Sequence, residues 1–361
     1  MKKRVLSIAV ILVMLVTMLT ALTACGDNAG TSGGDESNEG EDGLTIAIVV
    51  RGFGDNGPLD NLAEGALRAE RDFGVTLVKV ESDTPARFEE DIRAVSADAD
   101  LVVTTFPNMT DATVRVAEEF PDTRYAAIFQ FVNDENNTVA NLWDTEFHGQ
   151  QAFYIAGYMA AQLSENNRIG LIIGGEEPTP NAEGNAFMQG VRDSNPDVEV
   201  EFAFVGSYED PATAKEIASA MIARGADFLQ TSAGASNAGV IEAAQEAGVL
   251  VAGEITDFYE QYDGFVGVIG IGFGDTIYQA IEMLVNGEFP GGTRGIRTLA
   301  NGGYFMDWAT YERFADANET FGATFREVIE RAREIERQIL DEEKVIPFDP
   351  EVPNWDRISA Q

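Results

Sequence analysis

The sequence predicts an α/β protein with two doubly wound lobes, each built around a parallel sheet. First, short apolar runs alternate with helical segments over roughly 200 residues, the pattern of parallel βαβ units with right-handed crossovers. Second, the first run, Leu44–Val50, is almost continuously apolar, which is typical of a strand covered by helices on both faces. Third, the alternation stops near Asn141–Thr145 and starts again at Asn167, so the chain divides into two similar halves.

The predicted strands are short apolar runs, most of them bounded by glycine-containing or polar turns. A glycine-rich turn from Arg51 to Pro58 follows the first strand and leads into the first helix. The strands are predicted at Leu44–Val50, Val75–Val80, Leu101–Thr105, Tyr125–Phe129, Ile169–Ile173, Val200–Val205, Phe228–Gln230, Val249–Ala252 and Phe265–Ile271.

The predicted helices fall between most of these strands. A polar helix over residues 318–341 follows them, with an apolar stripe that packs along one lobe and is too short for a coiled coil. The proline-containing end, Ile346–Gln361, is predicted to be an extended surface tail. The helices of the two halves are predicted at Leu59–Phe73, Ala86–Ala97, Asp111–Glu119, Gln150–Ser164, Asn185–Ser194, Pro211–Ala223, Ala238–Ala247 and Thr276–Val285.

The amino terminus is typical of a bacterial lipoprotein signal. A basic segment, Lys2–Arg4, precedes an apolar stretch, Val5–Leu19, and small residues lead to Cys25, the only cysteine. The apolar stretch is shorter than the roughly 20 residues that span a bilayer comfortably. We therefore expect cleavage after residue 24, a lipid on Cys25, and attachment to the outer face of the bacterial cell membrane. An ordinary secretory signal is the alternative. Residues 26–43 are polar and glycine-rich, which indicates a flexible tether.

The charge and the rare side chains exclude several functions. The mature chain has 21 basic and 61 acidic residues, so its formal charge of −40 argues against nucleic-acid binding. Once Cys25 is lipidated, no disulfide is possible, and His148 is the only histidine. No His-rich zinc site, Ser-His-Asp triad or phosphate-binding loop is expected. We predict no catalytic residues, no metal and no cofactor.

A ligand is expected beyond the carboxyl ends of the parallel strands. Asp55 and Asn56 follow the first strand and can hydrogen-bond a polar ligand. Glu254 and Asp257 follow a buried strand and can each accept bonds from a pair of sugar hydroxyls. The loop Ser232–Gly239, with Gly234 and Ser236, lets the backbone approach a ligand closely. Aromatic faces for a ring are available at Phe53, Phe106, Phe131 and Phe258.

Each of these residues has a structural alternative. Asp55 is also suited to cap its helix, and a glycine-rich loop often does no more than make a tight turn. Glu254 and Asp257 are also consistent with solvated loop acids. A single phenylalanine is more often part of a core than a stacking surface.

Several motifs resemble the basic membrane protein family of ABC-transporter substrate-binding lipoproteins, which includes purine-nucleoside receptors. The resemblance covers Leu44 to about Gly292. It is carried by Asp55 with Glu64-Gly65, Ala156-Gly157-Tyr158-Met159-Ala160-Ala161, Ile169–Gly175 with Pro178 and Phe187, Gly225-Ala226-Asp227, and Ala233-Gly234 with Gly239–Gly248. It implies a type I periplasmic-binding fold, in which three crossover strands join two lobes that close on a ligand.

The resemblance also implies partners and domain bounds. The partners are a small ligand (a nucleoside in many members), an ABC permease and an ATPase, and the receptor is expected to be a monomer. The expected domains are the signal 1–24, the lipidated tether 25–43, an N-terminal lobe of 44–145 with about 273–300, a C-terminal lobe of 146–272 with about 301–345, and the tail 346–361.

The sequence departs from the nucleoside-binding members at two loops. Asp55-Asn56-Gly57-Pro58-Leu59 stands where those members have Asp-Lys-Ser-Phe-Asn. Glu254 stands at the first aspartate of the family's Gly-Val-Asp-x-Asp-Gln, and Thr256 replaces the second. Import of a nucleoside, import of a sugar or another solute, and a sensory receptor of the same fold therefore remain open. A surface hydrolase with paired carboxylates is the alternative from a different class, and no nucleophile motif favours it.

Overall fold

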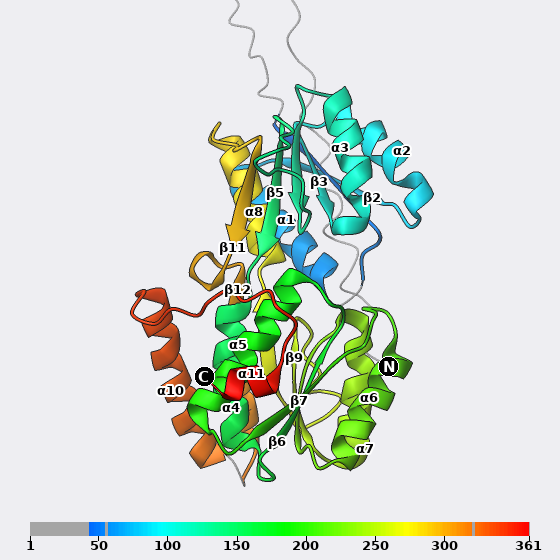
Figure 1. Ribbon diagram of the computed structural model, residues 1–361. Helices are drawn as coiled ribbons and strands as arrows, with labels where there is room; N and C mark the ends of the chain where they lie inside the picture. The colour runs from blue at the N-terminus through cyan, green and yellow to red at the C-terminus, as the bar shows by residue number, and fades with distance from the viewer. Residues whose placement is uncertain (1–42, 55–56, 320–321, 361) are drawn as a thin grey trace, which may run out of the picture. The chain divides into compact units, whose positions relative to one another are not determined.

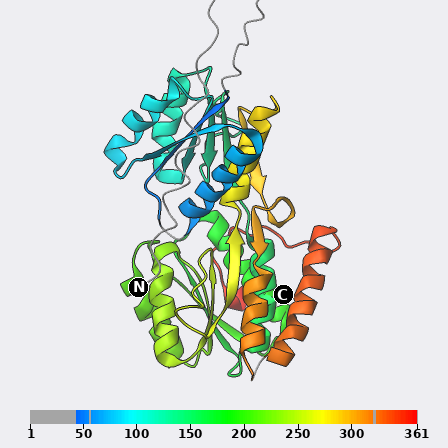
Figure 2. The same ribbon diagram turned by 180° about the vertical axis from the view of Figure 1, so that it is seen from behind.

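The computed structural model describes residues 43–54, 57–319 and 322–360. They form two six-stranded sheets, each with helices on both faces (Figures 1 and 2). The sheet that contains the first strand, with its helices, is called the first lobe, and the other sheet with its helices is called the second lobe. The two doubly wound lobes agree with the predicted fold class.

The sheet of the first lobe is entirely parallel, with the order β11-β5-β4-β3-β1-β2. Its strand β1 is buried on both faces: Ile46 and Ile48 pack in one hydrophobic cluster, and Ala47 and Val49 pack in another. This explains the unbroken apolar run. The strands are β1 (Thr45–Val50), β2 (Thr76–Glu81), β3 (Leu101–Thr105), β4 (Arg124–Ile128), β5 (Leu142–Phe147) and β11 (Thr293–Arg297).

The sheet of the second lobe has the order β12-β10-β9-β8-β6-β7. Its neighbouring pairs are parallel except β10 with β12, which is antiparallel. The strands are β6 (Arg168–Ile173), β7 (Glu199–Phe204), β8 (Phe228–Ser232), β9 (Leu250–Glu254), β10 (Phe265–Ile271) and β12 (Tyr304–Met306).

The helices cover the sheets in layers. On the first lobe, α1 and α8 cover one face, and α2 and α3 cover the other (Figure 2). On the second lobe, α4 and α5 lie on one face, and α6 and α7 on the other (Figure 1). The bounds are α1 (Pro58–Phe73), α2 (Pro85–Ser96), α3 (Thr110–Glu119), α4 (Gln150–Leu163), α5 (Pro178–Ser194), α6 (Pro211–Ala223), α7 (Asn237–Ala247), α8 (Phe273–Val285), α9 (Trp308–Ala317), α10 (Gly322–Leu340) and α11 (Trp355–Ser359).

Three crossovers connect the lobes, as the resemblance implies. The first runs from β5 to α4, the second from β10 to α8, and the third from β11 to β12 through the short helix Leu299–Asn301. The backbone N–H of His148 in the first crossover donates to Arg297 O at 2.7 Å, and Gly272 N donates to Gly303 O at 2.8 Å. A side chain at Gly272 would overlap the carbonyl oxygen of Gly302, so this close approach of two crossovers requires glycine.

The predicted helix over Asn185–Ser194 was wrong at its start, because α5 begins at Pro178. The two prolines, Pro178 and Pro180, favour a loop in a prediction from sequence. Proline is nevertheless tolerated in the first turn of a helix, where the backbone N–H groups have no intrahelical partner. The extra turns place Glu183 inside the helix. Strands β5, β11 and β12 and helix α9 were also missing from the prediction, since they are short or carry charged residues.

The predicted polar helix over 318–341 is α10, which starts at Gly322 and packs on α4 and α9 through a buried stripe that includes Phe325, Val328 and Ile329. The predicted extended tail was wrong at its end, where Trp355–Ser359 form α11 against α5. Asn354 caps this helix by accepting a hydrogen bond from Arg357 N. In the described residues, the helices are all too short or too polar to span a membrane.

Candidate ligand-binding site

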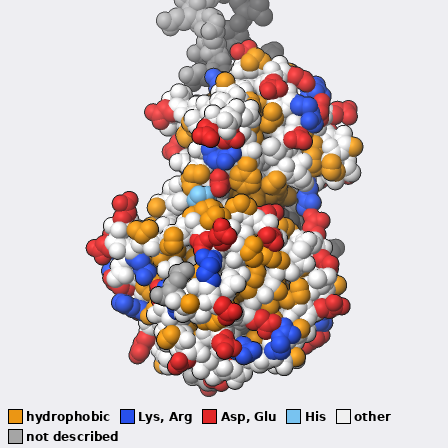
Figure 3. Space-filling model, viewed as in Figure 1, with side chains coloured by type: hydrophobic (Ala, Val, Ile, Leu, Met, Phe, Trp, Pro, Cys, Tyr) orange, Lys and Arg blue, Asp and Glu red, His pale blue; other side chains and the backbone are white. Residues whose placement is uncertain are grey.

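The loops that follow the strands of the two sheets meet at one ion pair. Arg51, directly after β1, binds Glu209, which lies between β7 and α6, with 2.8 Å between Nη1 and Oε1. The carboxyl ends of the parallel strands of both sheets therefore lie on the facing sides of the two lobes, where open α/β folds bind ligands. Hydrophobic and acidic side chains lie together where the lobes meet, beside the single histidine (Figure 3).

Five phenylalanines form an aromatic group at the carboxyl end of the first sheet: Phe106, Phe129, Phe131, Phe147 and Phe273. Phe129 is central, with its ring centroid 6.1 Å from Phe106, 5.9 Å from Phe131 and 5.8 Å from Phe147. Phe147 and Phe273 lie 5.1 Å apart. Phe131 is 45% exposed, and the guanidinium of Arg294 lies over its ring, 5.6 Å from the centroid, so the ring is partly open to solvent and partly covered by a cation.

Two members of the aromatic group have an unusual backbone. Phe106 follows β3 with φ 69°, and Phe129 follows β4 with φ 56°. A positive φ is strained for a bulky residue, and such strain gathers at binding sites, where the surroundings hold it in place. The two strained residues turn adjacent strand ends so that their rings come into contact.

The second lobe holds an acidic group of two glutamates, Glu183 on α5 and Glu254 at the end of β9. Ser232 at the end of β8 donates from Oγ to Glu254 Oε2 at 2.8 Å, and Tyr304 on β12 donates from Oη to Glu183 Oε1 at 2.6 Å. Glu183 is 3% exposed and Glu254 is 8% exposed. Both carboxyl groups are thus buried against neutral hydroxyl donors.

Burial changes the protonation of this group. Burial raises the pKa of Glu183 well above its ordinary value, and the nearby charge of Glu254 raises it further. Burial also raises the pKa of Glu254 to about 7, although the hydrogen bond from Ser232 lowers it. Near neutral pH, the two carboxyl groups are therefore at least partly protonated.

Two exposed residues, Tyr208 and Glu177, lie near the acidic group. Tyr208 donates from Oη to Glu177 Oε2 at 3.1 Å, and its ring lies so close to Gly174 that a side chain there would overlap it. Burial, followed by the charge of Glu177, raises the pKa of Tyr208. Tyr208 is 38% exposed, so it is open to solvent, whereas Glu183 and Glu254 are buried.

Gly234 and Ser236 support the loop of Tyr208. Gly234 has φ 58° and lies against the Tyr208 backbone. The Ser236 hydroxyl accepts a bond from Asp210 N at 2.8 Å and donates to Ser207 O at 3.1 Å. Because this hydroxyl both accepts and donates a hydrogen bond, Ser236 holds the loop of Tyr208 in place.

The other predicted site residues lie elsewhere. Phe53 follows β1, and Nζ of Lys79 on β2 lies over its ring, 5.4 Å from the centroid. The carboxylate of Asp257 is bound by both terminal nitrogens of Arg313 on α9, at 2.6 and 2.8 Å. Asp55 and Asn56 lie outside the described residues, as does Cys25.

The structure thus brings together part of the predicted site and adds to it. Phe106 and Phe131 both pack against Phe129, and Glu254 accepts a hydrogen bond from Ser232. Sequence reasoning missed Phe129, which was assigned to the end of a strand, and Phe147 and Phe273. It also missed Glu183, which fell in a segment predicted as a loop. No motif marks these residues, since only the packing brings them together.

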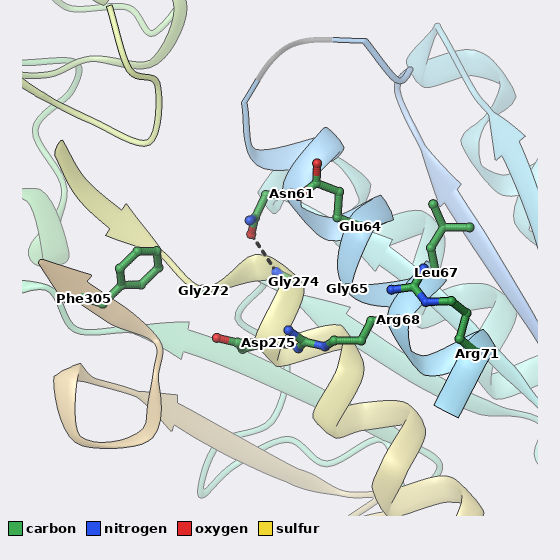
Figure 4. A pocket seen from close by; sticks show the side chains of 10 residues that line it. All are labelled: Asn61, Glu64, Gly65, Leu67, Arg68, Arg71, Gly272, Gly274, Asp275 and Phe305. Carbon is green, nitrogen blue, oxygen red and sulfur yellow. Dashed lines mark hydrogen bonds and ion pairs between the residues drawn. The ribbon is translucent and has the colours of Figure 1, made fainter. Parts of the chain in front are cut away.

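A separate groove of about 450 Å³ lies between α1 and α8, with the second crossover at one side (Figure 4). Its walls include Glu64, Arg68, Asp275 and Phe305. Arg68 binds Asp275 at 2.6 Å, and Asn61 Oδ1 accepts a bond from Gly274 N at 2.8 Å. The groove is not lined by the aromatic or the acidic group. Across the described ranges, no three His, Cys, Asp or Glu side chains are placed to hold a metal ion.

Comparison with known proteins places the chain in a family. The family model for Bmp, described as "ABC transporter substrate-binding protein PnrA-like", matches residues 44–347. Basic membrane protein B of Borrelia garinii subsp. bavariensis is 26% identical over 328 residues, which cover 88% of this chain and 92% of the relative. Basic membrane protein B of Borreliella burgdorferi is 27% identical over 255 residues, which cover 68% of this chain and 73% of the relative.

Solved structures agree in fold. A solute-binding protein of an ABC transporter system from Aeropyrum pernix K1 matches with a TM-score of 0.67 at 22% identity, over 85% of this chain and 94% of that one. A second, from Conexibacter woesei DSM 14684, matches with a TM-score of 0.66 at 20% identity, over 84% of this chain and 98% of that one. These matches confirm the predicted periplasmic-binding fold.

The family consists of extracytoplasmic proteins that bind small ligands and work with an ABC permease and an ATPase, and they are not enzymes. The predictions of a solute-binding protein and of a non-enzyme are therefore confirmed. The chain belongs to the Bmp family of PnrA-like ABC transporter substrate-binding proteins.

Proposed function

We propose that the chain binds a small polar ligand between its two lobes, with a nucleoside as the best candidate. The observation that carries the proposal is the pairing of a partly exposed aromatic group on the first lobe with buried carboxyl groups on the second. An aromatic face stacks with a flat ring, and carboxyl oxygens accept hydrogen bonds from hydroxyl or amino groups. Ligand pockets commonly combine these two kinds of surface.

We also propose that the lobes close on the ligand by a hinge motion. The crossovers are joined to one another by backbone bonds such as His148 N to Arg297 O, which favours movement of the lobes as units. Arg51 and Glu209 are 47% and 64% exposed, so their ion pair is weak, about 0–1 kcal/mol, and permits such movement. The proposed N-terminal lobe is 44–145 with about 273–300, and the proposed C-terminal lobe is 146–272 with about 301–345.

The proposed location is the outer face of the cell membrane, with a lipid on Cys25 and residues 26–43 as the tether. The support is the sequence pattern around Cys25, since these residues lie outside the described part of the chain. The receptor is proposed to act as a monomer, passing its ligand to the permease.

A thermal-shift screen of residues 26–361 tests the proposal, using nucleosides, free bases, sugars and amino acids. A ligand at 100 times its dissociation constant adds about 2.7 kcal/mol to the free energy of unfolding, which gives a clear rise in melting temperature. A rise with nucleosides supports the proposed ligand. A rise with sugars or amino acids alone contradicts nucleoside binding, and no rise with any class contradicts the proposed site.

A further inference from the structure

We infer that the ligand of this receptor carries a positive charge, as a protonated amine or an amidinium group, which binds between Glu183 and Glu254. The inference rests on the proposed function and names the chemical class of its ligand. Nucleosides with a protonated amino group belong to this class, whereas unmodified neutral nucleosides and neutral sugars do not.

The first observation is that the two buried carboxyl groups have no cationic partner. Tyr304 and Ser232 donate one neutral hydrogen bond each. No arginine or lysine among residues 43–54, 57–319 and 322–360 forms an ion pair with either glutamate. A buried carboxylate normally has a paired cation, because the loss of water is costly.

Asp144 shows how the same chain stabilises a structural buried carboxylate. Asp144 is fully buried on β5, and Arg294 Nε donates to its Oδ2 at 2.7 Å. Backbone N–H groups of Val132 and Asn133 donate to the same carboxylate at 3.1 and 3.0 Å. Glu183 and Glu254 have no such set of donors, although they are almost as deeply buried. Their environment is suited to a cation that comes from outside the chain.

The second observation is a buried acceptor without a partner on the same surface. Gln230 precedes Ser232 by two residues on β8, so both side chains project from the same face of the sheet. Gln230 is fully buried, and its Oε1 has no hydrogen-bond partner. Gln150, beside the first crossover, has a second buried and unpartnered Oε1. The free groups here are hydrogen-bond acceptors, which match a ligand rich in N–H donors.

The groups that face the two glutamates are acids or neutral hydroxyls. They are Glu177 before α5, Tyr208 from the loop after β7, Tyr304 from β12 and Ser232 from β8. Two adjacent buried carboxyl groups are not both ionised without a cation, so the free protein retains a proton there. A cationic ligand replaces that proton, whereas a neutral ligand leaves it in place.

The aromatic group completes the site on the other lobe. The ring of Phe131 is 45% exposed and already has the guanidinium of Arg294 5.6 Å from its centroid, so the aromatic group is suited to cover a flat apolar ring, while the charged nitrogen of the ligand is left to the two glutamates. The expected ligand is therefore a small ring compound that bears a charged nitrogen.

Proton linkage tests this inference. Binding to residues 26–361 would be measured by calorimetry at pH 6 and pH 8 for matched pairs: benzamidine with benzamide, tyramine with tyrosol, and the nucleosides of the screen. Because Glu254 titrates near pH 7, we expect cations to bind about tenfold more tightly at pH 8 than at pH 6, with release of protons. The neutral partner of each pair is expected to bind more weakly at both pH values.

Glu183→Gln tests the same inference through the protein. We expect it to weaken the binding of the cations at least tenfold at pH 8 and to weaken that of their neutral partners by a smaller factor. Glu199→Gln is the control, because Glu199 lies at the opposite end of the sheet and pairs with Arg168. A circular-dichroism melt of each variant shows whether it is folded.

The outcomes separate the inference from the proposed function. Preferential binding of neutral nucleosides, with affinity equal at both pH values or lower at pH 8, overturns the inference and supports the proposed function. Cation binding that is equal in wild type and Glu183→Gln also overturns the inference. No binding of any compound overturns both.

Discussion

The hydroxyl group of Tyr304 donates a 2.6 Å hydrogen bond to Oε1 of Glu183 and so joins β12 to α5 inside the second lobe. Strand β12 directly follows the third crossover. Gly149 of the first crossover lies against both side chains, and a Cβ there would overlap them. The buried carboxyl of Glu183 is therefore positioned by two of the segments that connect the lobes, which links the site to the hinge.

Replacing Tyr304 with phenylalanine is expected to lower the free energy of unfolding by about 1–3 kcal/mol, because Glu183 then loses its buried hydrogen-bond donor. Urea denaturation at pH 7 measures this loss. Tyr278→Phe is the matched control, since its hydroxyl bonds to Asp72 on the exposed surface at 3.1 Å. Equal losses in the two variants would contradict the importance given to the Tyr304 bond.

The stability of the ligand-free protein is expected to fall as the pH rises from about 5 to about 8. The pKa of Glu254 is about 7 in the folded protein and near 4.5 when unfolded, so the folded state binds more protons in this window. The effect of Glu254 is at most about 3 kcal/mol. The pKa of Glu146 is lowered, first by the hydrogen bond from His148, so its contribution is lost only at more acidic pH.

Melting temperatures of the wild type and of Glu254→Gln between pH 5 and pH 8 test this expectation. The variant cannot titrate at this position, so its melting temperature should vary less with pH. Parallel curves for the two proteins would show that Glu254 does not titrate in the window and would contradict the burial argument.

Glu254 and Asp257 are expected to differ in ligand binding, although both acids follow the same predicted strand. Glu254→Ala should reduce affinity by about 1–3 kcal/mol, since it removes a buried acceptor of the site. Asp257→Ala breaks a half-exposed ion pair with Arg313 and should cost less than about 1 kcal/mol of stability, with little change in affinity. Calorimetry with the ligand found in the screen compares them, and an equal loss of affinity would extend the site to Asp257.

Cys25→Ser is expected to release the protein from the membrane without unfolding it, because the lipid is proposed to be attached to this thiol. Fractionation of cells that express the two forms measures the distribution. The melting temperature of the released protein serves as the control for folding. Continued membrane attachment of the variant would contradict the lipid anchor.

Most of the fold could be predicted because its signals are local. The predicted strands Leu101–Thr105 and Phe265–Ile271, which are rich in Val and Ile, match β3 and β10 at both ends. The strands that were missed have weaker patterns. Thr293–Arg297 contains two arginines and a glycine, and its place at the edge of the sheet beside β5 comes from tertiary pairing.

The site was less predictable because its chemistry depends on burial and on contacts between distant segments. Glu183 looks like any other acid in a sequence with 61 of them, and only the packing of α5 against Tyr304 distinguishes it. Asp257 has the position expected of a binding residue, but Arg313, 56 residues later in the chain, binds its carboxylate. Such partners cannot be read from local spacing.

The carboxyl-terminal tail binds α5 close to Glu183. Asn185 donates from Nδ2 to Asp349 O at 3.0 Å and to Glu351 O at 2.7 Å, and its Oδ1 accepts a bond from Arg357 at 2.9 Å. Pro353 packs beside Gly184, where a Cβ would lie 2.8 Å from the proline ring. One amide side chain thus fixes three points of the tail.

Asn185→Ala is expected to lower the free energy of unfolding by about 1–3 kcal/mol, because it leaves carbonyl groups of the tail without their donor. Gln162→Ala is the control, since Gln162 bonds Ser194 on the exposed surface. Urea denaturation gives the stabilities, and limited proteolysis reports on the tail itself. Faster cleavage after residue 345 in Asn185→Ala alone would confirm that α5 holds the tail, whereas equal cleavage in both variants would show that the tail is held by other contacts, such as the stacking of Phe348 on His148.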